Sequence, residues 1–227
     1  MTPSAQQTID GFLANLDDFT ALIRSVDVDS WNLQTRCEGW TIAEIAAHVT
    51  GSVVDVTEGR VEIRGLDPAV VVARQTAERR GASADMIATE LAGARKTAAH
   101  LLAAFEPAAW NAPAPGDFPG SLRQAVHALW FDAFLHTDDI RSTLGRESDC
   151  GPGLQASLEF VADMLETRGG VSLTLAFDGT DAIDIAGGGR RLTGDPFQFL
   201  RAAKGRIDPA EIGLDDSINV NWASRGA

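Results

Sequence analysis

The segment LRQAVHALWFDAFLHTDDIRSTL, residues 122–144, decides the fold. Its apolar residues recur with the 3.6-residue period of an α-helix that packs one face against a core. Ser121 and Gln124 form a capping-box pattern directly after Pro119–Gly120, so we expect the helix to begin there. The buried face is expected to contain Leu122, Val126, Leu129, Ala133, Ile140 and Leu144.

The same predicted helix carries a carboxylate and an imidazole on its inner side. Asp132 and His136 are four residues apart, so both side chains can reach one point beside the helix. His136 falls on the apolar stripe and Asp132 at its edge, and an unpaired buried charge is very costly. The pair indicates either a common surface carboxylate beside a histidine or two ligands of a metal ion.

Composition and charge limit the classes of protein to which the chain can belong. Its 227 residues are 44% hydrophobic and 22% charged, which is typical of a globular protein with a sizeable core. A net charge of −13 argues against nucleic acid or an anionic membrane as partner. No segment has the length of a membrane span or the pattern of a signal peptide. Cys37 and Cys150 form no CxxC motif, so we expect a cytoplasmic protein with both thiols reduced and neither on a metal.

Three further amphipathic helices are predicted before residue 122. They span residues 4–26, a segment that begins at Thr41, and residues 83–105, and four such helices predict a bundle. In the connector between the first two, Trp31 and Trp40 are expected to cover one edge of the core. The inward residues should include Phe12, Leu16, Phe19 and Ile23, then Ile42, Ile45, Val49, Val53 and Val56, and then Ile87, Leu91, Ala98, Leu101 and Phe105.

His48 lies beside the buried face of the second predicted helix. An isolated histidine in such a position is more often a satisfied core residue than a ligand. Glu44 precedes it by four residues, so Glu44 and His48 form a rival ligand pair to Asp132 and His136. However, Thr41 and Glu44 form a T-x-x-E capping box, which directs the Glu44 carboxylate back toward the start of the helix.

Residues 59–81 form the most basic part of an acidic chain. They are predicted to form a frayed helical continuation, a short helix or a lid. The favoured interpretation is a solvated face whose charges are balanced by Glu58, Glu62 and Glu78, and the alternative is a binding edge for carboxylates. The basic residues are Arg60, Arg64, Arg74, Arg79 and Arg80.

The pattern changes after Gly145. A helix is predicted over residues 154–168, followed by strands at 171–177 and 182–186 and a possible third strand in GGGRRLT, residues 187–193. The three glycines are expected to form a hairpin turn. Asp195 and the proline after it then open a helix that runs to about Ala203.

The predicted fold class is therefore α+β. Residues 1–147 should form a four-helix bundle and residues 150–227 a small α+β domain. In the bundle, His48, Asp132 and His136 would offer two imidazoles and one carboxylate from inward faces. Such a donor set leaves a divalent ion with a net positive charge and an open position, as in catalytic zinc sites. A water molecule or a soft thiolate can take that position.

Two segments resemble the paired motifs of the mycothiol-dependent maleylpyruvate isomerase family, within the wider DinB-like metal-binding superfamily. They are GWTIAEIAAHVTG, residues 39–51, and DAFLHTDDIRSTLGR, residues 132–146. In that family a histidine follows a Trp-Ser/Thr-x-x-(Glu/Asp) helix start, and a later Glu-x-x-x-His followed by Asp-(Leu/Ile)-Arg completes the metal site. The matching positions are His48, Asp132 and His136, with Asp139, Ile140, Arg141, Leu144 and Gly145 continuing the second motif.

The resemblance extends to the end of the chain, because DPFQFLRAAKGR, residues 195–206, is similar to a late segment of the family. It implies that Arg206 holds a carboxylate of the substrate, with Arg141 and Arg64 as weaker candidates. The sequence departs from the family at Asp132, where a glutamate is usual. Aspartate is one methylene shorter, so its helix must approach the metal more closely or a water must intervene.

The resemblance implies an enzyme that binds a divalent metal, with zinc as the first candidate, and uses mycothiol or a similar thiol as cosubstrate. Such an enzyme would be an isomerase or an S-transferase. In an isomerase of this kind, a thiolate adds to the double bond of the substrate, the bond rotates, and elimination returns the thiol. The alternative is a non-catalytic DinB-like protein that binds a metal or ligand without turnover.

Overall fold

The computed structural model describes residues 3–60, 67–115, 118, 120–148 and 150–220. The chain divides between Ser148 and Asp149 into two compact units. The first is built of helices and the second contains a small three-stranded sheet. The predicted α+β fold class is therefore confirmed, as is the helical nature of the N-terminal part.

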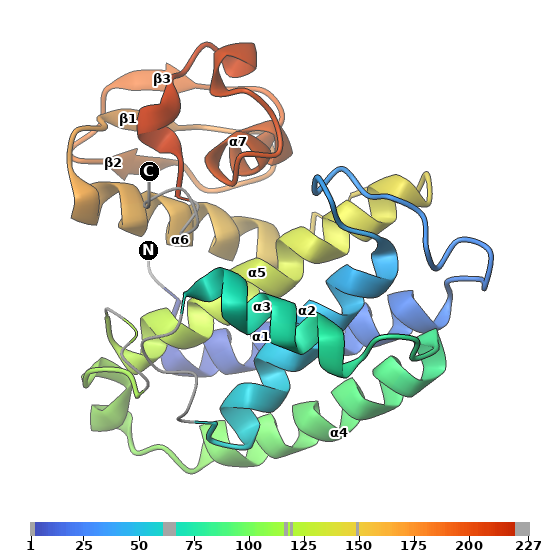
Figure 1. Ribbon diagram of the computed structural model, residues 1–227. Coiled ribbons are helices and arrows are strands. Elements are labelled where there is room, and N and C mark those ends of the chain that lie inside the picture. Colours follow the sequence, from blue (N-terminus) through green and yellow to red (C-terminus); the bar gives the residue numbers. More distant parts are fainter. Residues whose placement is uncertain (1–2, 61–66, 116–117, 119, 149, 221–227) are drawn as a thin grey trace. The chain divides into compact units, whose positions relative to one another are not determined.

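Four long helices form the bundle of the first unit (Figure 1). They are α1 (Ala5–Arg24), α2 (Ile42–Thr57), α4 (Ala84–Ala103) and α5 (Leu122–Thr143). Helix α1 packs against α4 and α5, and α2 packs against the same two helices. A short 3₁₀ helix, η2 (Pro107–Asn111), precedes α5.

Capping boxes begin three of these helices where the sequence carries their signature. The Ser4, Thr41 and Ser121 side chains accept hydrogen bonds from backbone N–H groups of α1, α2 and α5, and the residue three positions on returns the contact each time. Each box satisfies backbone donors that a helix start leaves unpaired. The start of α5, and with it the orientation of Asp132 and His136, is thus set by local sequence.

Most residues of the predicted buried faces are buried, but Leu129 and Leu144 are only half-buried, and three residues near the ends of α2 and α4 are exposed. Val56 is 55% exposed, Leu101 42% and Phe105 40%, although the periodicity placed all three inward. Val56 and Leu101 lie in the last turn of α2 and α4, and Phe105 lies beyond the end of α4. A 3.6-residue period identifies a face of a helix, but it does not show where the packing partner ends.

Residues 67–78 contain a short helix rather than a lid or a continuation of α2. Helix α3 (Pro68–Glu78) is capped by the Asp67 side chain, starts with proline, and packs against α2 (Figure 1). All of its 11 residues are described, and only Gln75 among them is buried. The predicted basic segment also includes Glu62 and Arg64, which lie outside the described residues.

The second unit contains two helices and a small sheet, and α6 packs against both β2 and α7. Its helices are α6 (Pro152–Arg168) and α7 (Pro196–Ala203), and its strands are β1 (Leu173–Leu175), β2 (Ile183–Ile185) and β3 (Arg190–Leu192). The strand order is β2-β1-β3, with β1 antiparallel to β2 and parallel to β3. Two 3₁₀ helices follow, η3 (Pro209–Ile212) and η4 (Asp216–Ile218). Among the described helices, none is both long and apolar enough to cross a membrane.

The glycines before β3 do not form the predicted hairpin turn. Strand β3 pairs with β1 in parallel, and not with β2. Ala186, Gly187 and Gly188 have φ values of 51°, 81° and 84°, so the chain turns away from β2 instead of folding back along it. It then crosses the start of β1 so closely that a Cβ on Gly189 would lie 2.3 Å from the Ser172 carbonyl oxygen.

Candidate metal centre

Three side chains of the first unit meet between α2 and α5. His48 comes from α2, and Asp132 and His136 come from α5, with one potential ligand atom of each within 4.8 Å of the others. The Nε2 atom of His48 lies 3.1 Å from Asp132 Oδ2, and the Nε2 atom of His136 lies 3.8 Å from Asp132 Oδ1. The structure therefore brings together all three side chains that the sequence singles out as candidate ligands.

These distances fit the donor set of a divalent metal ion. Ligand atoms about 2.0–2.2 Å from a tetrahedral ion are about 3.4 Å apart, close to the separations seen here. Two neutral imidazoles and one carboxylate leave a tetrahedral ion with an open position. The side chain of His136 is 6% exposed, that of His48 13% and that of Asp132 27%, so solvent reaches the group from the Asp132 side.

Asp132 reaches both imidazoles although it is shorter than the glutamate usual in the resembling family. One carboxylate oxygen faces His48 and the other faces His136, each within 4 Å of a ring nitrogen. The packing of α2 against α5 brings His48 close enough for this contact.

The indole ring of Trp40 packs against both histidine rings, a contact that the sequence did not predict. Its ring lies parallel to that of His136, with centroids 5.9 Å apart, and meets His48 edge-on at 5.3 Å. Trp31, by contrast, is buried as expected and donates from Nε1 to the Ala82 carbonyl. Trp40 directly precedes Thr41, the N-cap of α2. This position could have shown that its ring lies near the start of the helix that carries His48.

Backbone contacts hold Trp40 in place. Its carbonyl oxygen accepts from the Thr35 backbone N–H at 2.8 Å and from the Thr35 hydroxyl at 2.9 Å. Its own N–H donates to the Cys37 carbonyl at 3.0 Å, and Gly39 between them has a φ of 80°. That turn requires a residue without strain at positive φ. Trp40 is thus presented by a closed turn instead of a flexible loop.

His136 is oriented by a buried carboxylate on the next turn of α5. Its Nδ1 atom lies 3.1 Å from Asp139 Oδ2, and Asp139 is fully buried. The other oxygen of Asp139 accepts from Nε of Arg36 at 2.9 Å, and the same guanidinium pairs with Asp138. Because a carboxylate can only accept here, Nδ1 of His136 carries the proton and Nε2 offers its lone pair to the site.

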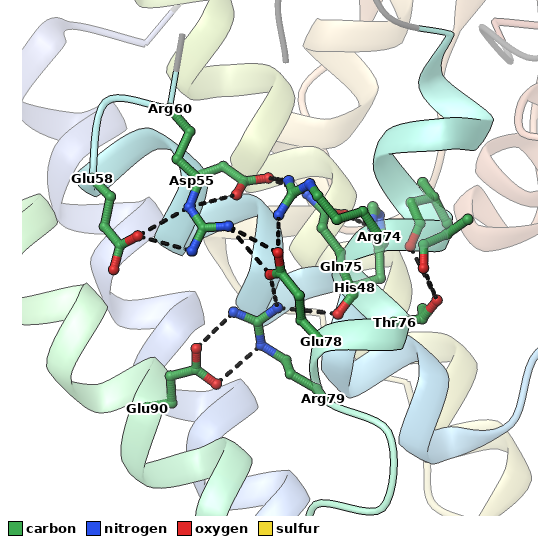
Figure 2. A network of polar contacts seen from close by, with 12 residues as sticks. His48, Asp55, Glu58, Arg60, Arg74, Gln75, Thr76, Glu78, Arg79 and Glu90 are labelled. Carbon is green, nitrogen blue, oxygen red and sulfur yellow. Dashed lines mark hydrogen bonds and ion pairs between the residues drawn. The ribbon is translucent and has the colours of Figure 1, made fainter. Parts of the chain in front are cut away.

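His48 has a different partner on its outer side. Its Nδ1 atom lies 2.8 Å from Oε1 of Gln75, on α3 (Figure 2). Nε2 of Gln75 in turn donates to Asp55 at 2.7 Å. Neither Gln75 nor Asp55 belongs to a sequence motif. Their link to His48 depends on the packing of α3 against α2, which the sequence does not show.

The rival candidate Glu44 is engaged at its own helix end. Its Oε2 atom accepts from the Thr41 backbone N–H and from the Thr41 hydroxyl, each at 2.8 Å, as the capping box predicts. Arg141 donates to the Glu147 carbonyl at 3.4 Å. Arg206 belongs to the second unit, and Arg64 lies outside the described residues. Cys37 and Cys150 are not joined in a disulfide.

Arg60, Arg74 and Arg79 pair with acidic side chains, but the face is not simply solvated as expected, because Arg79 is buried and Asp55 and Glu90 are among the partners. Arg74 contacts Asp55 at 2.5 Å and Glu78 at 2.9 Å, and Arg60 lies 3.1 Å from Glu78 (Figure 2). Arg79 makes two hydrogen bonds to Glu90 of α4, at 3.0 and 2.6 Å. Burial alone would lower the pKa of Arg74, but its bonds to Glu78 and Asp55 outweigh burial and raise it.

Comparison with solved structures places the fold beside that of a known enzyme. The crystal structure of the mycothiol-dependent maleylpyruvate isomerase matches with a TM-score of 0.66 at 14% identity, over 91% of this chain and 92% of that one. A histidine-to-alanine mutant of the mycothiol-dependent maleylpyruvate isomerase matches with a TM-score of 0.65 at 14% identity, with the same coverage. At this identity the likeness is one of fold.

The family comparison rests on the sequence of the bundle. No curated protein matches the chain significantly. The family described as the mycothiol maleylpyruvate isomerase N-terminal domain matches residues 12–141, which include His48, Asp132 and His136. The match spans more than half of the chain. The protein therefore belongs to the mycothiol maleylpyruvate isomerase N-terminal domain family.

Proposed function

We propose that the protein is a metal-dependent enzyme that uses a low-molecular-weight thiol for isomerisation or S-transfer, with mycothiol as the first candidate for the thiol. The observation that carries the proposal is the meeting of His48, Asp132 and His136 in one cluster, within a bundle of this family. The bundle, residues 1–147, would hold the metal and the thiol. The domain of residues 150–227 would carry the proposed carboxylate-binding residue, Arg206.

The charges of the proposed ligands suit thiol chemistry. His48 and His136 would bind through neutral Nε2 atoms, and Asp132 would add one negative charge. A divalent ion held there would remain positive and would lower the pKa of a bound thiol, supplying a thiolate near neutral pH. Zinc fits this donor set best, because it accepts imidazole, carboxylate and thiolate ligands in a tetrahedral arrangement.

The remaining residues of the cluster would orient and shield it. Trp40 covers one side of both imidazoles and limits the access of water there. Asp139 and Gln75 hold the outer nitrogens of the two rings, which fixes the direction of each Nε2 lone pair. These contacts keep the donors in place without depending on the ion.

We also assign the binding of a substrate carboxylate to Arg206. It follows α7 in a Schellman motif: Gly205, with a φ of 68°, donates to Ala202, and the Arg206 N–H donates to the Arg201 carbonyl at 2.8 Å. The backbone of Arg206 is thereby fixed and a guanidinium can bind a carboxylate through two hydrogen bonds. Arg206→Lys should raise KM for a carboxylate substrate more than it lowers kcat.

Metal and thiol binding can be tested on the purified protein. The wild type should contain about one divalent ion per chain, and His48→Ala should lose most of it while its circular dichroism stays helical. Mycothiol added to the cobalt-substituted protein should produce the absorption of thiolate ligation, whereas S-methylated mycothiol should not. Absence of a stoichiometric ion in the wild type would remove the proposal.

Turnover separates the enzyme from a binding protein of the same fold. Isomerisation of maleylpyruvate in the presence of mycothiol, followed through the NMR signals of its double-bond protons, is the first assay. Electrophiles that accept a thiol are the second, with the S-conjugate as product. Metal and thiol binding without turnover of either class of substrate would leave a non-catalytic binding protein.

A further inference from the structure

The face of α2 that carries His48 also carries two residues that receive α3. His48, Gly51 and Asp55 follow one another at intervals of three and four residues, so they line one side of the helix. Gln75 of α3 lies against this side and is 3% exposed. A Cβ on Gly51 would be only 2.6 Å from Cγ of Gln75, so glycine at this position makes room for the amide.

The amide of Gln75 joins His48 to Asp55. Its Oε1 atom lies 2.8 Å from Nδ1 of His48, and its Nε2 atom lies 2.7 Å from Oδ2 of Asp55 (Figure 2). Asp55 is 3% exposed and also contacts Arg74 at 2.5 Å. A carboxylate between two donors accepts from both.

This arrangement determines which way the amide faces. If the amide were turned by 180°, its oxygen would meet the Asp55 carboxylate and two acceptors would face each other in a buried place. Asp55 therefore holds Nε2 of Gln75 on its own side and leaves Oε1 toward His48. An oxygen acceptor at that position requires a proton on Nδ1 of His48. The other ring nitrogen, Nε2, lies 3.1 Å from Oδ2 of Asp132, and it would offer its lone pair when a metal ion takes the place of the proton between them.

We propose that Gln75 is a positioning residue for the metal centre: it keeps the proton of His48 on Nδ1 and directs the Nε2 lone pair at the site, with Asp55 setting the polarity of the amide. The inference rests on the proposed metal-binding function. It makes α3 a part of the centre, although no residue of α3 belongs to the candidate ligand set.

The position of Gln75 is itself fixed from both sides. The Gln75 carbonyl accepts from Nη1 of Arg79 at 3.1 Å, and Arg79 is paired with Glu90 of α4. On the other side, Arg74, the residue before Gln75, forms an ion pair with Asp55 of α2. The amide therefore has little freedom to adapt if one of its two partners is changed.

The decisive experiment measures zinc affinity by competition with a chromophoric chelator. Gln75→Met keeps the volume but removes both hydrogen bonds, and it should weaken zinc binding about 10- to 100-fold, as loss of such a supporting contact does in other zinc sites. Thr76→Val is the matched control, because it changes the next residue of α3, whose hydroxyl donates to the Val72 and Ala73 carbonyls of the same helix, and leaves the amide of Gln75 and its ties intact. Its zinc affinity should equal that of the wild type.

A charge-swapped pair tests the polarity argument. Gln75→Glu alone places two carboxylates side by side and should weaken zinc binding. Adding Asp55→Asn restores a donor opposite the new acceptor, so the double variant should bind zinc more tightly than Gln75→Glu. The readout is the same affinity, supported by thermal unfolding to show that both variants fold.

NMR with ¹⁵N-labelled histidine measures proton exchange at His48, which a purely structural role of Gln75 would not change. Nδ1 of His48 should carry a slowly exchanging proton in the zinc-loaded wild type, and Gln75→Met should speed its exchange. A zinc-loaded wild type with the proton on Nε2, or equal zinc affinities of Gln75→Met and wild type, would overturn the positioning role alone. Equal losses in Gln75→Met and Thr76→Val would do the same. A wild type that binds no zinc overturns the proposed function and this inference together.

Discussion

Asp139 and His136 are joined by a buried hydrogen bond between Oδ2 and Nδ1, 3.1 Å apart, one turn along the same helix. The second oxygen of Asp139 is held by Arg36, from the turn that also presents Trp40. His136 is thus supported by a carboxylate and His48 by the neutral amide of Gln75. A carboxylate raises the basicity of a bound imidazole more than an amide does, so we expect His136 to be the stronger of the two ligands.

Asp139→Asn should therefore weaken zinc binding about 10- to 100-fold, because the ring loses its charged acceptor and Arg36 loses one of its partners. The measurement is zinc affinity by chelator competition. Asp138→Asn is the control: it alters the same Arg36 contact but leaves the Asp139 carboxylate in place. A similar loss in both variants would assign the effect to Arg36 and the turn instead of His136.

Asp132→Glu should lower metal affinity although it restores the residue usual in the family. The aspartate oxygens already lie 3.1 and 3.8 Å from the two Nε2 atoms, so an added methylene crowds a site that fits the shorter side chain. Zinc affinity and the cobalt spectrum of the variant measure this. Tighter binding than in the wild type would show that aspartate is a compromise.

Trp40 should act as a fluorescent reporter of the site. Its ring lies within 6 Å of both histidine rings, so binding of cobalt or of a thiol should change its emission. Trp40→Phe removes that response while the other four of the five tryptophans stay. If the change in emission survives in Trp40→Phe, the ion binds elsewhere or alters the bundle as a whole.

Gly51→Ala should weaken zinc binding although the substitution removes no polar group. In an exposed helix interior, alanine stabilises by about 1 kcal/mol relative to glycine. Here the new Cβ would meet the Gln75 side chain at 2.6 Å and push the amide away from His48. Gly93→Ala in α4, where a Cβ meets nothing within 4 Å, is the control and should raise the melting temperature with zinc affinity unchanged.

The docking of α3 should weaken in acid. Burial raises the pKa of Glu78, but the hydrogen bond and charge of Arg74 and the charge of Arg60 outweigh it, so the pKa lies below 4.5. A lowered pKa gives stability that is present above pH 4.5 and is lost as the pH falls through the folded-state value. The difference in melting temperature between wild type and Glu78→Gln should therefore shrink as the pH is lowered from 6 to 3.

Most of the bundle could be predicted because its signals are local. The capping boxes and apolar stripes of α1, α2 and α5 lie within single segments, and so does the pair of Asp132 and His136. The addition of His48 required two helices to face each other. Inward faces and spacing suggested that step, and the resemblance to a family supported it.

What the sequence did not predict depends on contacts between distant segments. Gln75 looks like an ordinary polar residue in a charged helix, and only the packing of α3 on α2 makes it the partner of His48. Trp40 could be placed at the edge of a core but not against two imidazoles. The parallel pairing of β3 with β1 was missed because three glycines are also typical of a hairpin.

Helix α3 buries Gln75 alone and is otherwise held by ion pairs. Such a helix should open more readily than its neighbours, so its amide protons should exchange with deuterium well before those of α2 and α5. Each opening would take the acceptor away from His48 while the bundle stays folded. If the proposed site holds a metal, the rate of metal release should then follow the local opening of one short helix, and it should rise with salt although the proposed ligands themselves are untouched.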